Sequence, residues 1–398
     1  MTAGLYLHFP FCTHRCGYCD FYTVADRDAL IPAYINALLN EIELYARHGN
    51  YASLAFSTLY FGGGTPSLMS TNQLSAIVGK LLSSFRFSSS PEITLEVNPE
   101  TVDLAKLQAI RQAGVNRLSI GFQSFQPGEL LFLERTHNVQ TSITCYENAR
   151  SAGFENISLD LIFALPGQTI RTWQYNLAEA VFLAPEHVSA YALTFEEGTP
   201  LTSRLKKGTI KSASEKTQSQ MHLKTISFLR DEGYAQYEIS NYAKPGKESG
   251  HNSKYWDGSP YLGLGVSSHS FVNGRRFWNV RNMNRYIEAL ADHTLAVDGE
   301  EFLSRENILV EKIWLGLRQR KGLNIADFEN LLQASFFATY KRQLAAFFDE
   351  DLSSPEMAAK LRVGSTGIAS KLLKIEGGFL RLTDQGIVLC EAICGEFI

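Results

Sequence analysis

The 398-residue sequence has little cysteine and no long apolar run. Six cysteines are too few to hold a disulfide-stabilised scaffold together. No stretch reaches the roughly 18 uninterrupted apolar residues of a membrane-spanning helix, and residues 1–11 lack the basic segment and cleavage site of a signal peptide. We therefore expect a cytoplasmic protein with no direct membrane insertion.

An excess of positive charge is also absent. The chain holds 37 Lys and Arg against 41 Asp and Glu, and the last 98 residues share this balance, with 12 against 13. Nucleic-acid binders concentrate basic residues, so we expect no nucleic-acid partner. The 45% of hydrophobic residues is typical of a globular chain, and the length suits two domains or one large α/β barrel with an appendage.

Short β-prone runs alternate with amphipathic stretches from residue 4 to about residue 241, which is typical of repeated βα units around a parallel sheet. The expected strands are 5–9, 58–61, 93–97, 117–122, 157–163 and 187–193. The clearest helical patterns are 32–47, 71–82 and 101–113, the last two opened by Thr71 and Thr101 as N-caps. Six units make three quarters of a (β/α)8 barrel, so the expected fold class is α/β, with a partial (β/α)6 barrel over residues 1–236.

The rest of the chain divides into two further segments. Residues 237–300 are rich in Gly, Tyr and Asn, which predicts a loop-rich cap over the barrel mouth. Residues 301–398 predict two helices split at Gly322, then a hairpin and a helix, an order that resembles a winged helix. Because this domain lacks a basic surface, we expect a structural or partner-docking role rather than DNA reading.

Polar or unusual residues recur where the expected strands end. In barrels of this kind chemistry collects in the loops after the carboxyl ends of the strands, so we expect these residues to converge. In strand order they are Cys12, Cys16 and Cys19, then the GGGTP segment (62–66), then Glu96 and Asn98, Gln123, Asp160, and finally Tyr191 and Ala192.

The spacing Cys12-x3-Cys16-x2-Cys19 gathers three soft thiolates on one short loop. Three thiolates suit three irons of a four-iron cluster and leave the fourth iron open to a substrate or cosubstrate. A structural zinc site is an alternative that needs a fourth ligand from a distant residue. Three free cysteines in a surface loop are the remaining interpretation.

The GGGTP segment offers bare backbone that an amino or carboxylate group can approach closely, and Thr65 adds a hydroxyl. It has neither the Gly-Lys-Ser/Thr of a Walker loop nor the GxGxxG spacing, so it does not indicate nucleotide phosphate binding. A tight turn that requires glycine would explain the segment equally well.

Several segments together carry a resemblance to a known family: YLHFPFCTHRCGYCDF (6–21), YFGGGTPS, LEVNPE, SIGFQSF, LERTH and DLIFALPGQT. They resemble the radical S-adenosylmethionine (SAM) proteins of the oxygen-independent coproporphyrinogen dehydrogenase family, over nearly the whole chain. The resemblance implies a [4Fe-4S] cluster on Cys12, Cys16 and Cys19, with SAM chelating the open iron through its amino and carboxylate groups. It implies SAM contacts at the matching positions Tyr6, Tyr18, Gly63, Gly64, Thr65, Glu96, Gln123, Arg135, Asp160 and Ala192.

Two departures favour the HemW branch of this family. The dehydrogenase continues its signature to a fourth cysteine and has a long arm before the first strand, whereas here Asp20 and Phe21 follow Cys19 and five residues precede Tyr6. A smaller departure is Ala164, which stands where the family usually has Gly. The HemW branch implies a haem chaperone that passes haem to acceptor proteins such as respiratory enzymes, as a monomer or a cluster-promoted dimer. The alternatives are oxidative decarboxylation of coproporphyrinogen III and another radical modification such as methylation.

The hexapeptide HNSKYW, within the expected cap, resembles the HNxxYW motif associated with haem in HemW. Imidazole is a standard axial ligand of haem iron, and aromatic rings offer flat apolar surface to a porphyrin. The implied haem site is His251, Asn252, Tyr255 and Trp256, with His251 on the iron. Without the resemblance, a His beside an Asn in a Gly-rich loop is usually a turn residue.

Four other residues complete the candidates. His269, in GLGVSSHSF, is a second candidate haem ligand. Cys145, Cys390 and Cys394 lie in amphipathic helical patterns, and we expect them to be buried apolar residues.

Overall fold

The computed structural model of the chain describes residues 2–47 and 49–397, which form two compact units. The first comprises the chain up to Gln218 with Ser249–Lys254 and Ser259–Phe302. The second comprises Ser219–Glu248, Tyr255–Gly258 and the chain from Leu303 onward. Most of the expected cap therefore belongs to the first unit, which differs from the division predicted at residues 236 and 300.

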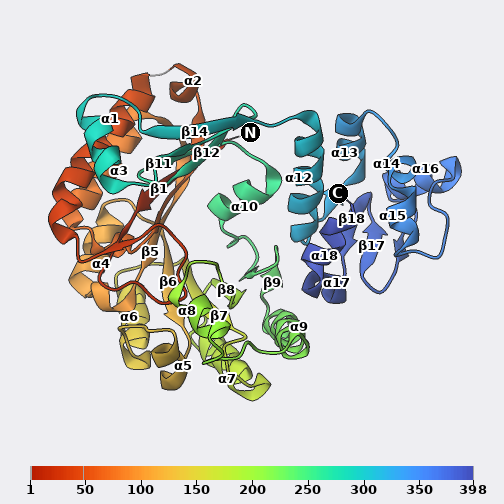
Figure 1. Cartoon of the computed structure of the whole chain (residues 1–398), viewed down its shortest axis with the longest axis horizontal. Helices are drawn as coiled ribbons and strands as arrows, with labels where there is room; N and C mark the ends of the chain where they lie inside the picture. Colours follow the sequence, from red (N-terminus) through yellow and green to blue (C-terminus); the bar gives the residue numbers. More distant parts are fainter. Residues whose placement is uncertain (1, 48, 398) are drawn as a thin grey trace. The chain divides into compact units, whose positions relative to one another are not determined.

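The first unit is built on an open, curved sheet (Figure 1). Its parallel strands pair in chain order: β1 (Ala3–Phe9), β4 (Ala55–Gly63), β5 (Arg86–Val97), β6 (Arg117–Gln123), β7 (Ile157–Phe163) and β8 (His187–Ala192). All six predicted strands and the α/β fold class are confirmed. The register sets Tyr6 beside Tyr60, Tyr60 beside Thr94 and Thr94 beside Arg117, which forms a row of polar side chains across the sheet.

Helices cover the outer face of this sheet (Figure 1). They are α1 (Ile31–Arg47), α3 (Thr71–Ser84), α4 (Leu104–Gln112), α5 (Pro127–Phe132), α6 (Val139–Ser151) and α7 (Ile170–Phe182), with the short α2 (Gly49–Ala52) after α1. Helix α8 (Pro200–Lys206) instead contacts the loop between Cys12 and Cys19 through Leu201. Helix α1 buries Ile35, Leu38 and Ile42, as its amphipathic pattern predicts.

The two predicted threonine caps are wrong. Ser70 caps α3: its hydroxyl accepts the Gln73 amide, and the Gln73 side chain accepts the Ser70 amide in return. Asp103 caps α4 by accepting the Lys106 amide, while Thr101 ends a separate short turn, Pro99–Thr101. Each cap lies one or two residues from the threonine expected, because the neighbouring Ser or Asp is also a strong N-cap.

The segment expected to be a loop-rich cap instead extends the sheet. Strand β11 (Tyr261–Leu264) pairs in parallel with β1, and β12 (His269–Val272), β13 (Arg275–Asn279) and β14 (Val297–Phe302) continue in antiparallel order, with α11 (Met283–Ala291) against α1. The glycines serve close strand packing here, since a Cβ on Gly263 would lie 2.1 Å from the His269 carbonyl oxygen.

The second unit carries the predicted helical pair and hairpin. Helices α12 (Arg305–Arg318) and α13 (Ile325–Leu332) flank Gly322, and a four-stranded sheet follows the order β15 (Leu323–Asn324), β18 (Phe379–Leu382), β17 (Leu373–Glu376), β16 (Ile368–Ala369). The other elements are α9 (Glu215–Asp231), β9 (Ala235–Gln236), β10 (Asn241–Ala243), α14 (Phe336–Thr339), α15 (Lys341–Ala345), α16 (Pro355–Val363), α17 (Asp384–Val388) and α18 (Cys390–Gly395). Cys390 and Cys394 are buried, as is Cys145 in the first unit, which confirms all three predictions.

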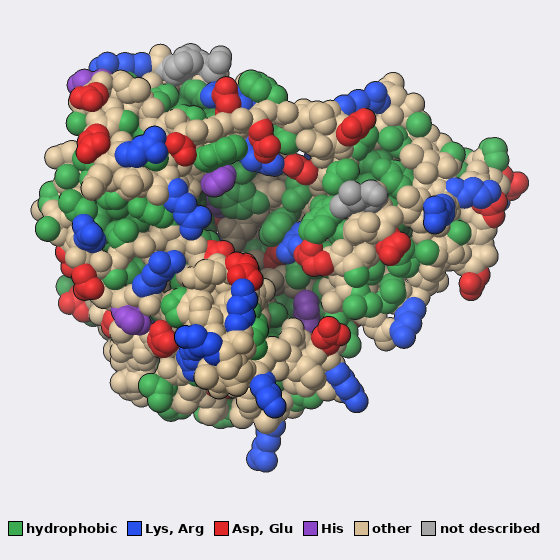
Figure 2. All heavy atoms as spheres, viewed as in Figure 1, with side chains coloured by type: hydrophobic (Ala, Val, Ile, Leu, Met, Phe, Trp, Pro, Cys, Tyr) green, Lys and Arg blue, Asp and Glu red, His purple; other side chains and the backbone are tan. Residues whose placement is uncertain are grey.

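Among the described residues, no helix is both long and apolar enough to cross a membrane. Acidic and basic side chains are interspersed over the face shown in Figure 2.

Candidate functional site

The three clustered cysteines lie where β1 ends. Cys12 closes the two-residue strand β2 (Phe11–Cys12), which pairs with β3 (Val24–Ala25), and the Cys19 amide donates to the Cys16 carbonyl oxygen at 3.1 Å. Burial raises the pKa of Cys12 to about 11 and raises that of Cys19, and the charges of the neighbouring thiols raise both further. The three sulfurs therefore share one electrostatic environment, in which a cationic metal group would offset the repulsion between thiolates.

The GGGTP segment packs against the backbone of this loop. The Gly64 amide donates to the Phe9 carbonyl oxygen and the Thr65 amide to that of Phe11, both at 2.8 Å. A Cβ on Gly64 would lie 2.7 Å from the Phe11 oxygen, so only glycine fits. This approach places the Thr65 hydroxyl 3.4 Å from the Cys12 sulfur, to which it donates.

Arg135 also contacts the cysteine loop. Its Nη1 donates to the Cys16 sulfur at 3.5 Å and its Nη2 to Asn98 Oδ1 at 2.7 Å. Its Nε is buried and has no hydrogen-bond partner among the described residues. Because a buried guanidinium N–H without an acceptor is costly, Arg135 fits an anionic ligand such as a carboxylate. Asn98 also donates to the Thr65 hydroxyl at 3.2 Å, so its side chain connects Arg135 to Thr65.

Glu96 lies below the glycine segment. Its Oε2 accepts the Gly63 amide at 3.1 Å and its Oε1 accepts the Tyr60 hydroxyl at 2.9 Å. Burial raises the pKa of Glu96 to about 7, although both hydrogen bonds oppose this shift. Gly63 has φ +113°, so the tight-turn interpretation of the glycines also holds at this position.

Asp160, on β7, lies deeper in the same face of the sheet. Its carboxylate accepts the Ser119 hydroxyl at 2.8 Å and the Ser158 hydroxyl at 3.1 Å. Burial raises its pKa, while the positive charge of Arg117, which is 1% exposed, acts in the opposite direction. Asp160 is thus held by two serine hydroxyls, whereas Glu96 is held by a tyrosine hydroxyl and a backbone amide.

The structure places the other predicted contact residues around this centre. Gln123 ends β6 with φ +51°, and a Cβ on Gly121 would lie 3.1 Å from Gln123 Nε2 and 3.6 Å from Arg135 Nη2. Tyr18 packs against an apolar cluster beside the loop, and burial raises its pKa. Tyr6 donates to or accepts from His8 Nδ1 at 3.0 Å, and Ala192 ends β8.

The donor set suits a cluster better than a single ion. Within the described ranges, no three His, Cys, Asp or Glu side chains gather in a way that holds one metal ion. In an iron–sulfur cubane each thiolate binds a different iron, and donors to the sulfurs tune the cluster. The cysteines, with donors from Thr65 and Arg135, fit that arrangement.

The HNSKYW segment forms helix α10 (Gly250–Asp257), at the end of the sheet opposite to the cysteine loop. The Glu92 carboxylate accepts the amides of Gly250 and His251 at 2.9 and 3.0 Å. His251 is 1% exposed, and its Nδ1 shares a 2.9 Å hydrogen bond with the Thr58 hydroxyl. These partners lie away from the carboxyl ends of the strands, so the position expected over the barrel mouth is wrong for this motif.

The remaining motif residues and the second candidate histidine have different surroundings. Trp256 belongs to the second unit, where the Arg318 guanidinium lies 5.1 Å from its ring and Gln319 donates to its carbonyl oxygen. Burial and nearby Lys254 lower the pKa of His251 to about 3, so its imidazole is neutral. His269 is exposed, on β12, beside the Trp278 ring at 5.9 Å between centroids.

Comparisons with known proteins identify the family of this chain. The Radical SAM superfamily profile matches residues 6–178, and the HemN C-terminal domain profile matches residues 303–389. A protein of Bacillus subtilis named "Heme chaperone HemW" is 33% identical over 395 residues, which cover 99% of this chain and 98% of the relative. This chain belongs to the HemW family. A Mycobacterium tuberculosis relative with the same name is 36% identical over 81% of this chain and 83% of its own.

A solved structure supports the fold of this HemW family member. The coproporphyrinogen III oxidase HemN of Escherichia coli, described as a radical SAM enzyme, superimposes with a TM-score of 0.80 at 24% identity. The match covers all of this chain and 90% of HemN. At this identity the likeness establishes the shared architecture, not a shared reaction.

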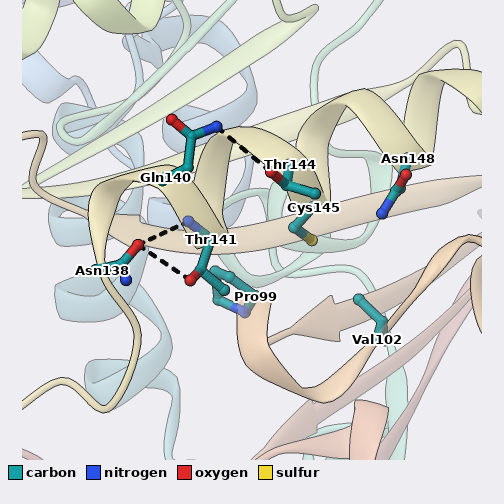
Figure 3. A pocket seen from close by; sticks show the side chains of 8 residues that line it. All are labelled: Pro99, Val102, Asn138, Gln140, Thr141, Thr144, Cys145 and Asn148. Carbon is teal, nitrogen blue, oxygen red and sulfur yellow. Dashed lines mark hydrogen bonds between the residues drawn. The ribbon is translucent and has the colours of Figure 1, made fainter.

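A surface cavity of about 280 Å³ lies away from these groups, between α6 and the turn after β5 (Figure 3). It is lined by Pro99, Val102, Asn138, Gln140, Thr141, Thr144, Cys145 and Asn148. None of the predicted SAM, cluster or haem residues lines it. Asn138 in this cavity is already engaged as the N-cap of α6, where it accepts the Thr141 amide at 2.9 Å.

Proposed function

We propose that this HemW family member binds haem and transfers it to acceptor proteins, using a chain that also holds a [4Fe-4S] cluster with exchangeable SAM. The observation that carries the proposal is the similarity, over 99% of the chain, to a relative named as a haem chaperone. The sequence adds that Asp20 and Phe21 follow Cys19, where the dehydrogenase signature continues to a fourth cysteine.

The cluster would be held by Cys12, Cys16 and Cys19, and when bound it supplies one-electron chemistry at an iron with an open position. The chain's own residues prepare the space beside it. The free Nε of Arg135 would take the SAM carboxylate, and the Gly63–Gly64 backbone would lie beside the methionyl group. Glu96 and Asp160 would accept hydrogen bonds from the ammonium group or the ribose hydroxyls. The remaining SAM contacts would come from Tyr6, Tyr18, Thr65, Gln123 and Ala192.

His251 is the proposed axial ligand of the haem iron, with Asn252, Tyr255 and Trp256 beside the porphyrin. Its neutral imidazole suits metal binding. Its burial means that haem would reach it only if the first turn of α10 leaves the Thr58 and Glu92 contacts. His269 is accessible without such a change, which makes it the specific alternative.

Haem titration under anaerobic conditions, followed by Soret absorbance, tests the proposal on the cluster-loaded protein. The variants are His251→Ala, His269→Ala and, as a matched surface control, His293→Ala. We expect saturable one-to-one binding to the wild type and to His293→Ala, with weaker binding or a shifted Soret band in His251→Ala. If only His269→Ala changes haem binding, His269 on β12 is the ligand of the haem iron instead of His251.

Absence of saturable haem binding in every form would overturn the chaperone function. Coproporphyrinogen turnover with SAM and a reductant would then be assayed, because it is the reaction of the alternative. For transfer, haem-loaded protein is mixed with an apo-acceptor such as a respiratory enzyme, and the haem content of each is measured after separation. We also propose a monomer or a cluster-promoted dimer, which size-exclusion chromatography with and without the cluster distinguishes.

A further inference from the structure

Glu134 joins the cysteine loop to the rest of the first unit. It follows α5 in the segment LERTH, with φ +55°, and this left-handed turn sends three consecutive side chains to different partners. Leu133 is buried in an apolar cluster with Ile162, Arg135 reaches the Cys16 sulfur, and Glu134 faces the loop itself.

The Glu134 carboxylate holds the middle of the cysteine loop. Its Oε2 accepts the amide of Gly17, which lies between Cys16 and Cys19, at 3.0 Å. A Cβ on Gly17 would lie 2.9 Å from the same oxygen, so the absence of a side chain permits this contact. A carboxylate acceptor makes this hydrogen bond stronger than one between neutral groups.

The carbonyl of Gly17 is held as well. The Leu201 amide, in the first turn of α8, donates to the Gly17 oxygen at 2.9 Å. Leu201 is buried in the same apolar cluster as Leu133, against which Tyr18 packs. Both backbone groups of Gly17 are therefore fixed by anchored parts of the unit outside the loop.

Two basic side chains, one histidine and one arginine, lie beside the Glu134 carboxylate. His14 Nε2, from the loop, lies 3.9 Å from Oε2, and Arg204 Nη1, from α8, lies 3.7 Å from Oε1. All three side chains are about half exposed, so these pairs add little energy by themselves. The hydrogen bond from the Gly17 amide is therefore the main contact between Glu134 and the loop.

We propose that Glu134 is a positioning residue for the cluster: by holding Gly17 it keeps the three cysteines on one side of the loop, ready to receive iron. It acts through the backbone and does not touch a cysteine sulfur. This inference rests on the proposed cluster and goes beyond it, because it assigns a role to a residue outside the cysteine signature. Gly17 has the widest backbone freedom in the loop, so losing its anchor frees the segment that joins Cys16 to Cys19.

The experiment compares Glu134→Ala, Glu134→Gln and Gly17→Ala with the control pair Glu197→Ala and Glu197→Gln. Glu197 is a surface carboxylate paired with Lys206 of α8, so the control removes a nearby charge without touching Gly17. The first readout is hydrogen–deuterium exchange of the cluster-free protein in peptides spanning residues 12–20. The second is the rate at which a chelator removes iron from the reconstituted protein.

We expect Glu134→Ala and Gly17→Ala to accelerate exchange in the loop and iron loss by about tenfold, the size of effect that follows from losing one hydrogen bond to a charged acceptor. Glu134→Gln keeps an oxygen acceptor and should stay within about threefold of the wild type. The Glu197 variants should match the wild type. Peptides from α3 and α4, elsewhere in the first unit, report the stability of that unit and should not change in any variant.

The inference fails if Glu134→Ala matches the wild type in both readouts, or if exchange rises equally in the loop and in the α3 and α4 peptides, which would indicate a general structural role. If the wild type takes up no cluster, the proposed function fails instead, and exchange of the cluster-free loop still decides whether Glu134 anchors it. The two failures are therefore distinguishable.

Discussion

The imidazole of His251 lies against the ring of Tyr60, with 5.1 Å between centroids and 27° between planes. The Tyr60 hydroxyl in turn donates to Glu96, whose other oxygen accepts the Gly63 amide. One aromatic side chain thus separates the histidine of the HNSKYW helix from the glycine segment beside the cysteines. The two ends of the sheet are connected by contacts that the sequence spacing does not suggest.

Tyr60→Phe should weaken SAM binding and leave haem binding unchanged. The substitution keeps the ring against His251 and removes the hydroxyl that stabilises the ionised Glu96 carboxylate, so the pKa of Glu96 rises above about 7. We expect a loss of about 5–10-fold in SAM affinity, measured by equilibrium dialysis on the cluster-loaded protein at neutral pH. If haem binding weakened as well, the Tyr60 hydroxyl would not act on SAM binding alone, which would contradict this prediction.

Arg135→Lys should lose more SAM affinity than Tyr60→Phe. Lysine keeps the positive charge, but it cannot donate to Cys16, Asn98 and a carboxylate from one planar group. We expect about 10–100-fold weaker SAM binding, which corresponds to one charge-assisted hydrogen bond or more. Arg150→Lys is the control, because Arg150 pairs with Glu186 elsewhere in the unit. Equal loss in both variants would show that general destabilisation is the cause.

The six parallel strands were predictable because each is a buried apolar run between amphipathic segments. Strand β11 was not, since Gly263 is a loop signal in the sequence and a site of close backbone approach in the fold. The sequence alone does not show that the His269 backbone on β12 lies next to Gly263 on β11. Local patterns therefore identify elements that bury side chains and miss those that depend on a distant neighbour.

The residues of the candidate site also differ in how far the sequence reveals them. The cysteine spacing was visible because few other functions use three cysteines at that spacing, and the glycine segment because it directly follows a predicted strand. Asn98 was visible only as a polar strand end, and Glu134 was not visible at all, because its contact is with an amide 117 residues away. Helix α10 was missed because its N-terminus is capped by Glu92, which lies on β5.

The stability of the first unit should fall as pH rises from about 4.5 to about 7 because of Glu41. This carboxyl is fully buried, accepts hydrogen bonds from Tyr286, Asn279 and the Gly265 amide, and has its pKa raised by burial to about 7. Below pH 4.5 the group is protonated in both states. Between pH 4.5 and pH 7 Glu41 ionises only in the unfolded chain, which favours unfolding. Above pH 7 the free energy of unfolding is lower by the full amount, on the order of 3 kcal/mol.

Denaturant unfolding of Glu41→Gln and of wild type at pH 5 and pH 8 measures this effect. Glutamine cannot ionise, so the wild type should lose more stability between the two pH values than Glu41→Gln does. Glu43→Gln, an exposed position on the same helix, is the control and should behave as the wild type. If the wild type and Glu41→Gln show the same pH dependence, Glu41 does not carry the effect.

Substitutions of Ser70, the N-cap of α3, and of the adjacent Thr71 should differ in their effect on stability. Ser70→Ala removes the acceptor of the Gln73 amide and disrupts the reciprocal bond, so it should cost about 1 kcal/mol of unfolding free energy. Thr71→Ala, one residue later, removes a β-branched side chain from the first helical turn and should be neutral or slightly stabilising. Urea unfolding followed by circular dichroism compares the two. A larger loss for Thr71→Ala would support the cap that the sequence suggested and would place the start of α3 one residue later.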